Sequence, residues 1–87
     1  MMPIEMLNGA DATARIRSLA RDGWKVLGVD GFRLMPEGYV ASLDLILDLS
    51  SSGLAAEAAE AEALGFISKH AAADVMFEVV TDTHNGS

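Results

Sequence analysis

This sequence of 87 residues contains no cysteine, so neither a disulfide framework nor a thiolate metal site can stabilise it. Aromatic residues are also scarce, at 6% of the chain, whereas hydrophobic residues of all kinds make up 51%. A core of this composition must be built from leucine, valine, isoleucine, methionine and alanine. A chain this short forms one small domain and buries only about two-thirds of its unfolded surface. Its stability must therefore come from internal packing, or from packing together with a partner subunit.

Basic residues are nearly absent from the second part of the chain. Residues 36–87 contain Lys69 alone against nine acidic residues, a net charge of −8, whereas residues 1–35 carry five basic residues against four acidic ones. The whole chain has a net charge of −7. Such a charge repels phosphate backbones and anionic lipids, so we expect no binding to nucleic acid or to a membrane. A basic protein partner is compatible with this charge, although a solvated acidic surface is the simpler explanation.

Long apolar runs are also missing. No stretch of about 18 apolar residues is present, and the N-terminal residues lack a basic region followed by an apolar one. We therefore expect no membrane-spanning helix, no signal peptide and a cytoplasmic location. No linker divides the chain, so residues 1–83 are expected to form a single α+β domain, followed by a frayed tail over 84–87.

The most regular pattern in the sequence lies at residues 42–50, where leucine alternates with other residues. Side chains on a strand point to opposite faces with a period of two, so this pattern predicts a strand. One face carries the four leucines and should pack in the core. The other face carries Asp44 and Asp48, which must remain solvated. The four leucines are Leu43, Leu45, Leu47 and Leu49.

The rest of the chain alternates between helical and extended segments. Alanine-rich segments flanked by capping residues and glycine predict helices over residues 10–22 and 54–71. Serines at 50–52 are expected to cap the second helix. Hydrophobic and β-branched residues predict strands over residues 24–34, 39–50 and 74–83, and a weaker alternation predicts a short strand over 2–7.

The resulting order is βαββαβ, which is the order of the ferredoxin-like fold. That fold has a four-stranded antiparallel sheet with both helices on one face. If the weak strand over 2–7 does not form, the same helices would cover a three-stranded sheet. In either case the second face of the sheet is left open.

The turn at residues 36–38 decides which residues face each other across the central hairpin. Pro36 suits the first central position of a turn and Gly38 accepts a positive φ, which favours a three-residue loop. That loop places Asp30 opposite Asp44. A two-residue loop would shift the pairing by one residue and bring Lys25 opposite Asp48. The ion pair between Lys25 and Asp48 is worth at most about 1 kcal/mol, and a misplaced turn residue costs a similar amount. The two effects nearly balance, and we favour the first register for its turn chemistry.

With the three-residue loop, the open face combines apolar and acidic side chains. An exposed apolar patch is typical of an interface, so we expect a homodimer formed through this face. The candidate interface residues are Trp24, Val26, Phe32, Ile46, Met76 and Val80. The acidic residues expected around them are Asp30, Asp44, Asp48, Glu78 and Asp82.

No pattern in the sequence predicts catalysis, and we expect no cofactor and no metal. Asp44 and Asp48 lie four residues apart on one strand, roughly 13 Å, which is too far for a pair of carboxylates acting on one bond. His70 and His84 have no cysteine or nucleophilic serine arrangement around them.

Two alternatives to the homodimer remain open. Asn8, Gly9 and Asp11 lie at the start of the first predicted helix, where backbone N–H groups can hold an anion. By analogy with ferredoxin-like regulatory domains, this loop could bind a small ligand, which would make the chain a ligand sensor. The acidic charge of residues 36–87 is instead compatible with an inhibitor of a basic protein.

Overall fold

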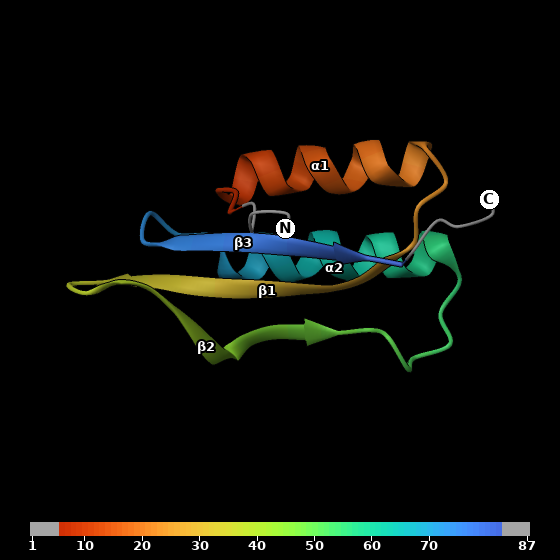
Figure 1. Cartoon of the computed structure of the whole chain (residues 1–87). Helices are drawn as coiled ribbons and strands as arrows, with labels where there is room; N and C mark the ends of the chain where they lie inside the picture. Colours follow the sequence, from red (N-terminus) through yellow and green to blue (C-terminus); the bar gives the residue numbers. More distant parts are fainter. Residues whose placement is uncertain (1–5, 83–87) are drawn as a thin grey trace.

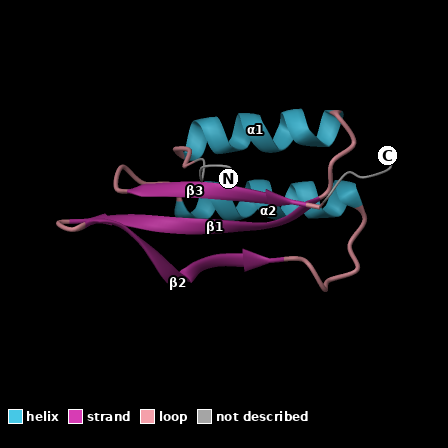
Figure 2. Cartoon of the chain, in the orientation of Figure 1, coloured by secondary structure: helices cyan, strands magenta, loops and turns pink. Residues whose placement is uncertain are grey.

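The computed structural model describes residues 6–82 of the chain, which form a small α+β domain (Figures 1 and 2). The elements follow the order α1 (Gly9–Arg21), β1 (Val26–Met35), β2 (Gly38–Asp48), α2 (Ala56–His70) and β3 (Val75–Thr81). The three strands are antiparallel and lie in the order β2-β1-β3. Both helices pack on one face of this sheet. Within residues 6–82, none of the helices or strands covers the other face.

The expected four-stranded, ferredoxin-like sheet is wrong. The described part of the segment 2–7 contributes a single bridge, in which the backbone of Leu7 exchanges two hydrogen bonds of 2.8 and 2.7 Å with Phe77. Asn8 follows at once as the N-cap of α1, so the chain leaves the sheet after one pair. Residues 2–5 lie outside the described residues, as does the predicted tail over 84–87.

The start of α1 confirms the capping predicted from the sequence, whereas the start of α2 does not. Asn8 Oδ1 accepts a hydrogen bond of 2.8 Å from the backbone N–H of Asp11. The N-cap of α2 is Ala55, which makes no side-chain capping bond. The serines at 50–52 come too early to cap it, and Ser52 Oγ instead donates to the carbonyl of Leu49.

The core lies between the two helices and the inner face of the sheet. Phe77 on the edge strand β3 is the largest fully buried side chain of the core. The Phe66 ring of α2 packs edge-on against the Phe77 ring, with ring centres 6.4 Å apart. Small residues on the helices let them approach each other and the sheet closely. The core cluster contains Ala12, Ile16, Val26, Val29, Leu45, Ala63, Ile67, Val75 and Phe77.

A wide bulge in β2 separates two registers of the β1–β2 hairpin. Beside the turn Met35 pairs with Gly38, so the loop has two residues and the predicted three-residue loop is wrong. Beyond the bulge Asp30 pairs with Ile46. Residues 42–45 of β2 therefore face only Gly31 of β1. Neither register expected from the sequence holds along the whole hairpin, and Asp30 does not lie opposite Asp44.

The bulge also explains why the leucine pattern is only partly a core pattern. Leu45 is buried at 1% exposure, Leu49 is buried and Leu47 is partly buried against the core. Leu43 is 91% exposed, so its expected place in the core is wrong. A bulge breaks the strict alternation of faces, which a sequence pattern alone does not show.

A second bulge lies in β1, between the pairs Val26–Thr81 and Gly28–Val80. The extra residue, Leu27, shifts the alternation by one position. Val26 is therefore turned toward the helices and is 1% exposed, whereas the sequence placed it on the open face. The predicted placement of Val26 on the open face is therefore wrong.

In the part of the chain that the structure describes, no helix is long and apolar enough to cross a membrane.

Candidate functional site

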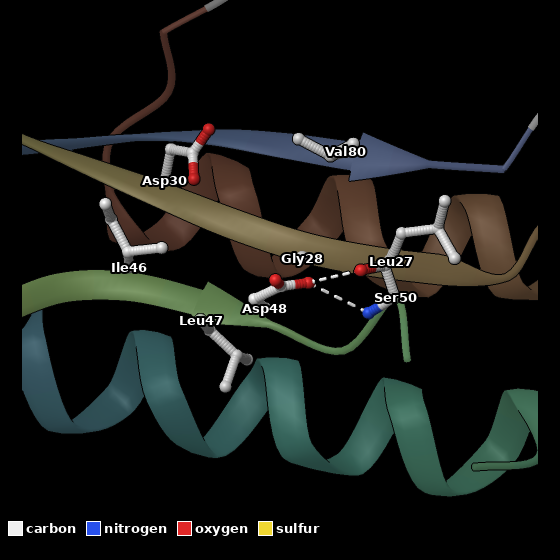
Figure 3. A pocket seen from close by; sticks show the side chains of 8 residues that line it. All are labelled: Leu27, Gly28, Asp30, Ile46, Leu47, Asp48, Ser50 and Val80. Atoms are coloured by element: carbon white, nitrogen blue, oxygen red, sulfur yellow. Dashed lines mark hydrogen bonds between the residues drawn. The ribbon is translucent and has the colours of Figure 1, made fainter. Parts of the chain in front are cut away.

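The open face is the side of the sheet turned away from α1 and α2. It can be followed on β2, where Leu47 points toward α2 and its neighbour Ile46 points away from it (Figure 3). Alternation along the three strands places apolar and acidic side chains from all three strands on this face. They include Asp30 and Phe32 of β1, Ile46 and Asp48 of β2, Met76, Glu78 and Val80 of β3, and, toward the hairpin turn, the paired residues Leu34 and Tyr39.

A hollow of about 300 Å³ lies on the open face, at the end of the sheet where β2 finishes (Figure 3). Its centre is Gly28 of the middle strand, which has no side chain to fill the space. Its apolar walls include Leu27, Ile46 and Val80, and Asp30 and Asp48 lie at its margin.

Gly28 is fixed at this position by the backbone of β2. A β-carbon at residue 28 would lie 2.6 Å from the carbonyl oxygen of Leu47, which is closer than real β-carbons approach. A glycine is therefore required at this position. Glycine inside a strand is the sequence signal for such a close approach, although it does not say which face becomes hollow.

Two carboxylates lie next to each other in the middle of the open face. Asp30 pairs directly with Glu78 of β3 on one side and with Ile46 of β2 on the other. Residues directly opposite each other on antiparallel strands have β-carbons about 5 Å apart. Asp30 and Glu78 therefore present two negative charges together beside the apolar wall formed by Ile46.

Asp48 is held at the edge of the hollow by Ser50. Its Oδ1 accepts hydrogen bonds of 2.6 Å from Ser50 Oγ and 3.0 Å from the Ser50 backbone N–H (Figure 3). These bonds favour the charged form, so they lower the pKa of the Asp48 carboxyl below its ordinary value. Asp48 therefore keeps a fixed negative charge at the margin of the hollow.

Asp44 and Asp82, the remaining predicted acidic residues, do not line the hollow, and neither does Glu78. Asp44 lies in the bulge of β2, where it accepts a hydrogen bond from Ser42 Oγ and one of 2.9 Å from Arg33 Nη2. These two donors lower the pKa of the Asp44 carboxyl. Asp82 follows β3, and its Oδ1 accepts a bond of 3.1 Å from the backbone N–H of Lys25.

Apart from the buried Val26, the predicted apolar interface residues divide into three groups. Ile46 and Val80 line the hollow and are 43% and 37% exposed. Phe32 and Met76 pair with each other farther along the sheet and are partly buried. Trp24 lies before β1 and is partly buried, with its backbone N–H donating to the Leu19 carbonyl at 2.9 Å.

In the predicted ligand loop Asn8 caps α1 and Gly9 lines a second hollow. The side chain of Asn8 is already used by the backbone of Asp11. This second hollow, of about 570 Å³, lies between α1 and α2 and includes Gly9 and Arg17 on α1 and Gly65 on α2. Asn8 and Asp11 do not line it.

The described residues contain no group of three or more histidine, cysteine, aspartate or glutamate side chains that could hold a metal ion. The ring of His70 lies against Phe66, with ring centres 4.7 Å apart.

The chain matches no protein-family model, no curated protein and no solved structure.

Proposed function

We propose that this chain is a non-enzymatic protein-interaction module that binds its partner through the open face of the sheet. The observation that carries the proposal is the hollow over Gly28, which has apolar walls and carboxylates at its margin. Exposed apolar surface next to a depression is typical of a place where another molecule packs.

The carboxylates favour a partner that presents arginine or lysine side chains. Such a side chain has an apolar stem that fits against Ile46 and Val80, and a cationic head that can reach Asp30. The net charge of −7 would also draw a basic partner toward the chain.

A second copy of the chain is a less favourable occupant of this face. Packing two open faces together would bring Asp30 and Glu78 of one copy against acidic residues of the other. Burying carboxylates without cationic partners costs several kcal/mol for each ion. The homodimer through the open face that the sequence suggests is therefore disfavoured, and the basic-partner alternative is the one we propose.

The test is a calorimetric titration of the chain with a hexa-arginine peptide. Any acidic protein attracts such a peptide, so the comparison is between two variants of equal net charge. One variant, Asp30→Asn with Glu78→Gln, removes two charges from the open face. The other, Glu57→Gln with Glu62→Gln, removes two charges from exposed positions on α2.

The open-face variant is expected to weaken binding by at least about tenfold, as for a lost direct charge pair. The helix variant should weaken it by less than about twofold, as for remote surface charges. Equal effects of the two variants would mean that only net charge attracts the peptide, and would refute a site on the open face.

A further inference from the structure

A second exposed apolar surface lies at the far end of the β1–β2 hairpin. Of the large hydrophobic side chains that are exposed in the described residues, most belong to the segment 34–43, and the others, Ile46 and Val80, line the hollow. The tip of this hairpin extends beyond β3 and the helices (Figure 1). The exposed residues in the segment are Leu34, Met35, Tyr39, Val40 and Leu43.

The same segment includes a free strand edge. β2 is the last strand in the sheet order β2-β1-β3, so its outer edge has no neighbouring strand among residues 6–82. Proteins commonly protect such edges with charged residues, proline or bulges. Residues 38–43 contain no charged residue and no proline, and the bulge includes only the last two of them, Ser42 and Leu43.

We propose that two copies of the chain pair antiparallel through the outer edge of β2 over residues 38–43. Antiparallel pairing of a strand with its own copy has two-fold symmetry, which is the usual symmetry of a dimer. The two three-stranded sheets then join into one of six strands. If the two-fold axis of the dimer passes through Ala41, Tyr39 of one copy lies opposite Leu43 of the other. These two exposed apolar side chains then cover each other.

The charges along this edge allow a second copy as its occupant. The chain is acidic elsewhere, but residues 38–43 bring no carboxylate to the contact. Asp44 lies three positions from Ala41, so the two copies of Asp44 lie six positions apart, roughly 20 Å along the strands. That separation exceeds the Debye length of about 8 Å at physiological salt. The nearest carboxylates of the two copies are instead Asp44 and Glu37, and the Arg33 guanidinium, 2.9 Å from Asp44, offsets their repulsion.

This dimer is independent of the proposed function, because it uses the strand edge and leaves both open faces accessible. Leu43 and Val80 are therefore matched positions for a test. Leu43 lies at the proposed dimer contact and Val80 lies in the hollow, and both are exposed hydrophobic residues on strands.

The experiment is sedimentation velocity at high micromolar concentration, with circular dichroism to confirm folding. The wild type and Val80→Lys are expected to sediment as dimers, and Leu43→Lys as a folded monomer. A monomeric wild type, a dimeric Leu43→Lys, or a Val80→Lys that alone becomes monomeric would each overturn the proposal.

A crosslinking measurement locates the axis. Because the chain contains no cysteine, an Ala41→Cys variant carries a single thiol in each copy. A short bis-maleimide should link two Ala41→Cys chains efficiently, and should not link two chains of Ala61→Cys, which places the thiol at an exposed position on α2. Equal crosslinking at both positions would contradict a contact at β2.

Discussion

Leu45 occupies the space that a side chain at Gly31 would need. A β-carbon at residue 31 would lie 2.6 Å from the β-carbon of Leu45 and 3.2 Å from its Cδ1. The two residues lie on facing strands, where the bulge of β2 passes over β1. The bulge, the glycine and the buried leucine therefore form one structural unit.

Gly31→Ala should destabilise the domain by about 1–3 kcal/mol, because the added methyl group collides with Leu45 in a packed core. Gly65→Ala is the matched control. It lies within α2, where an added β-carbon would meet no side chain and no other element within 4 Å, so it should stabilise the domain. The expected gain is about 0.5–1 kcal/mol. Urea denaturation of both variants checks the prediction, which fails if Gly31→Ala unfolds at the wild-type midpoint.

Leu45→Ala and Leu43→Ala should differ sharply although the two leucines are two residues apart. Leu45 is fully buried, so its truncation should cost about 2–5 kcal/mol. Leu43 is exposed in a single copy, so its truncation should change the stability of the monomer by no more than about 0.5 kcal/mol. Denaturation below the dimerisation range measures both. Equal losses would show that both leucines lie in the core.

Removing a hydroxyl next to Asp44 should raise the pKa of its carboxyl. The hydrogen bond from Ser42 is the largest cause of the lowered pKa, and Arg33 contributes next. A carboxyl with a lowered folded-state pKa adds stability above its unfolded pKa, and that stability is lost as the pH falls through the folded pKa. Ser42→Ala should therefore reduce the loss of stability on acidification below about pH 4.

The pKa itself is measured by an NMR titration of the Asp44 carboxyl carbon, and Asp48 in the same sample is the internal control. Ser42→Ala should move the Asp44 midpoint upward and leave that of Asp48 unchanged, because Asp48 is held by Ser50. An unchanged Asp44 midpoint would mean that Arg33 alone holds the charge.

Ile46→Lys should separate the two proposed surfaces. Ile46 lies on the open face and is partly exposed, so the variant should fold. The added lysine places a positive charge beside Asp30 and should weaken hexa-arginine binding by at least about tenfold. Its dimer should persist in sedimentation velocity. An unfolded variant would place Ile46 in the core and contradict the assignment of the open face.

The sequence predicted the elements of the fold better than their pairing. The helices and the central hairpin are local patterns, and local patterns are visible in a sequence. The prediction of a fourth strand was wrong, because Asn8 caps α1 directly after the single bridge at Leu7.

The candidate site was less predictable, because it depends on two bulges. Because of these bulges Val26, which was expected on the open face, is buried, and Leu43, which was expected in the core, is exposed. The hollow depends on the close approach of β2 to Gly28, which is a contact between distant residues. Gly28 and Gly31 interrupt the apolar pattern of β1 and were the available signals, but they do not reveal the direction of the shift.

The claim that the open face binds a cationic partner is tested most directly by NMR of isoleucine methyl groups during titration with hexa-arginine. Ile46 lies on the open face, whereas Ile16 and Ile67 are buried between the helices and the sheet. We predict that the Ile46 methyl signals move progressively to saturation while those of Ile16 and Ile67 remain in place. Binding that leaves the Ile46 signals unmoved would contradict the account.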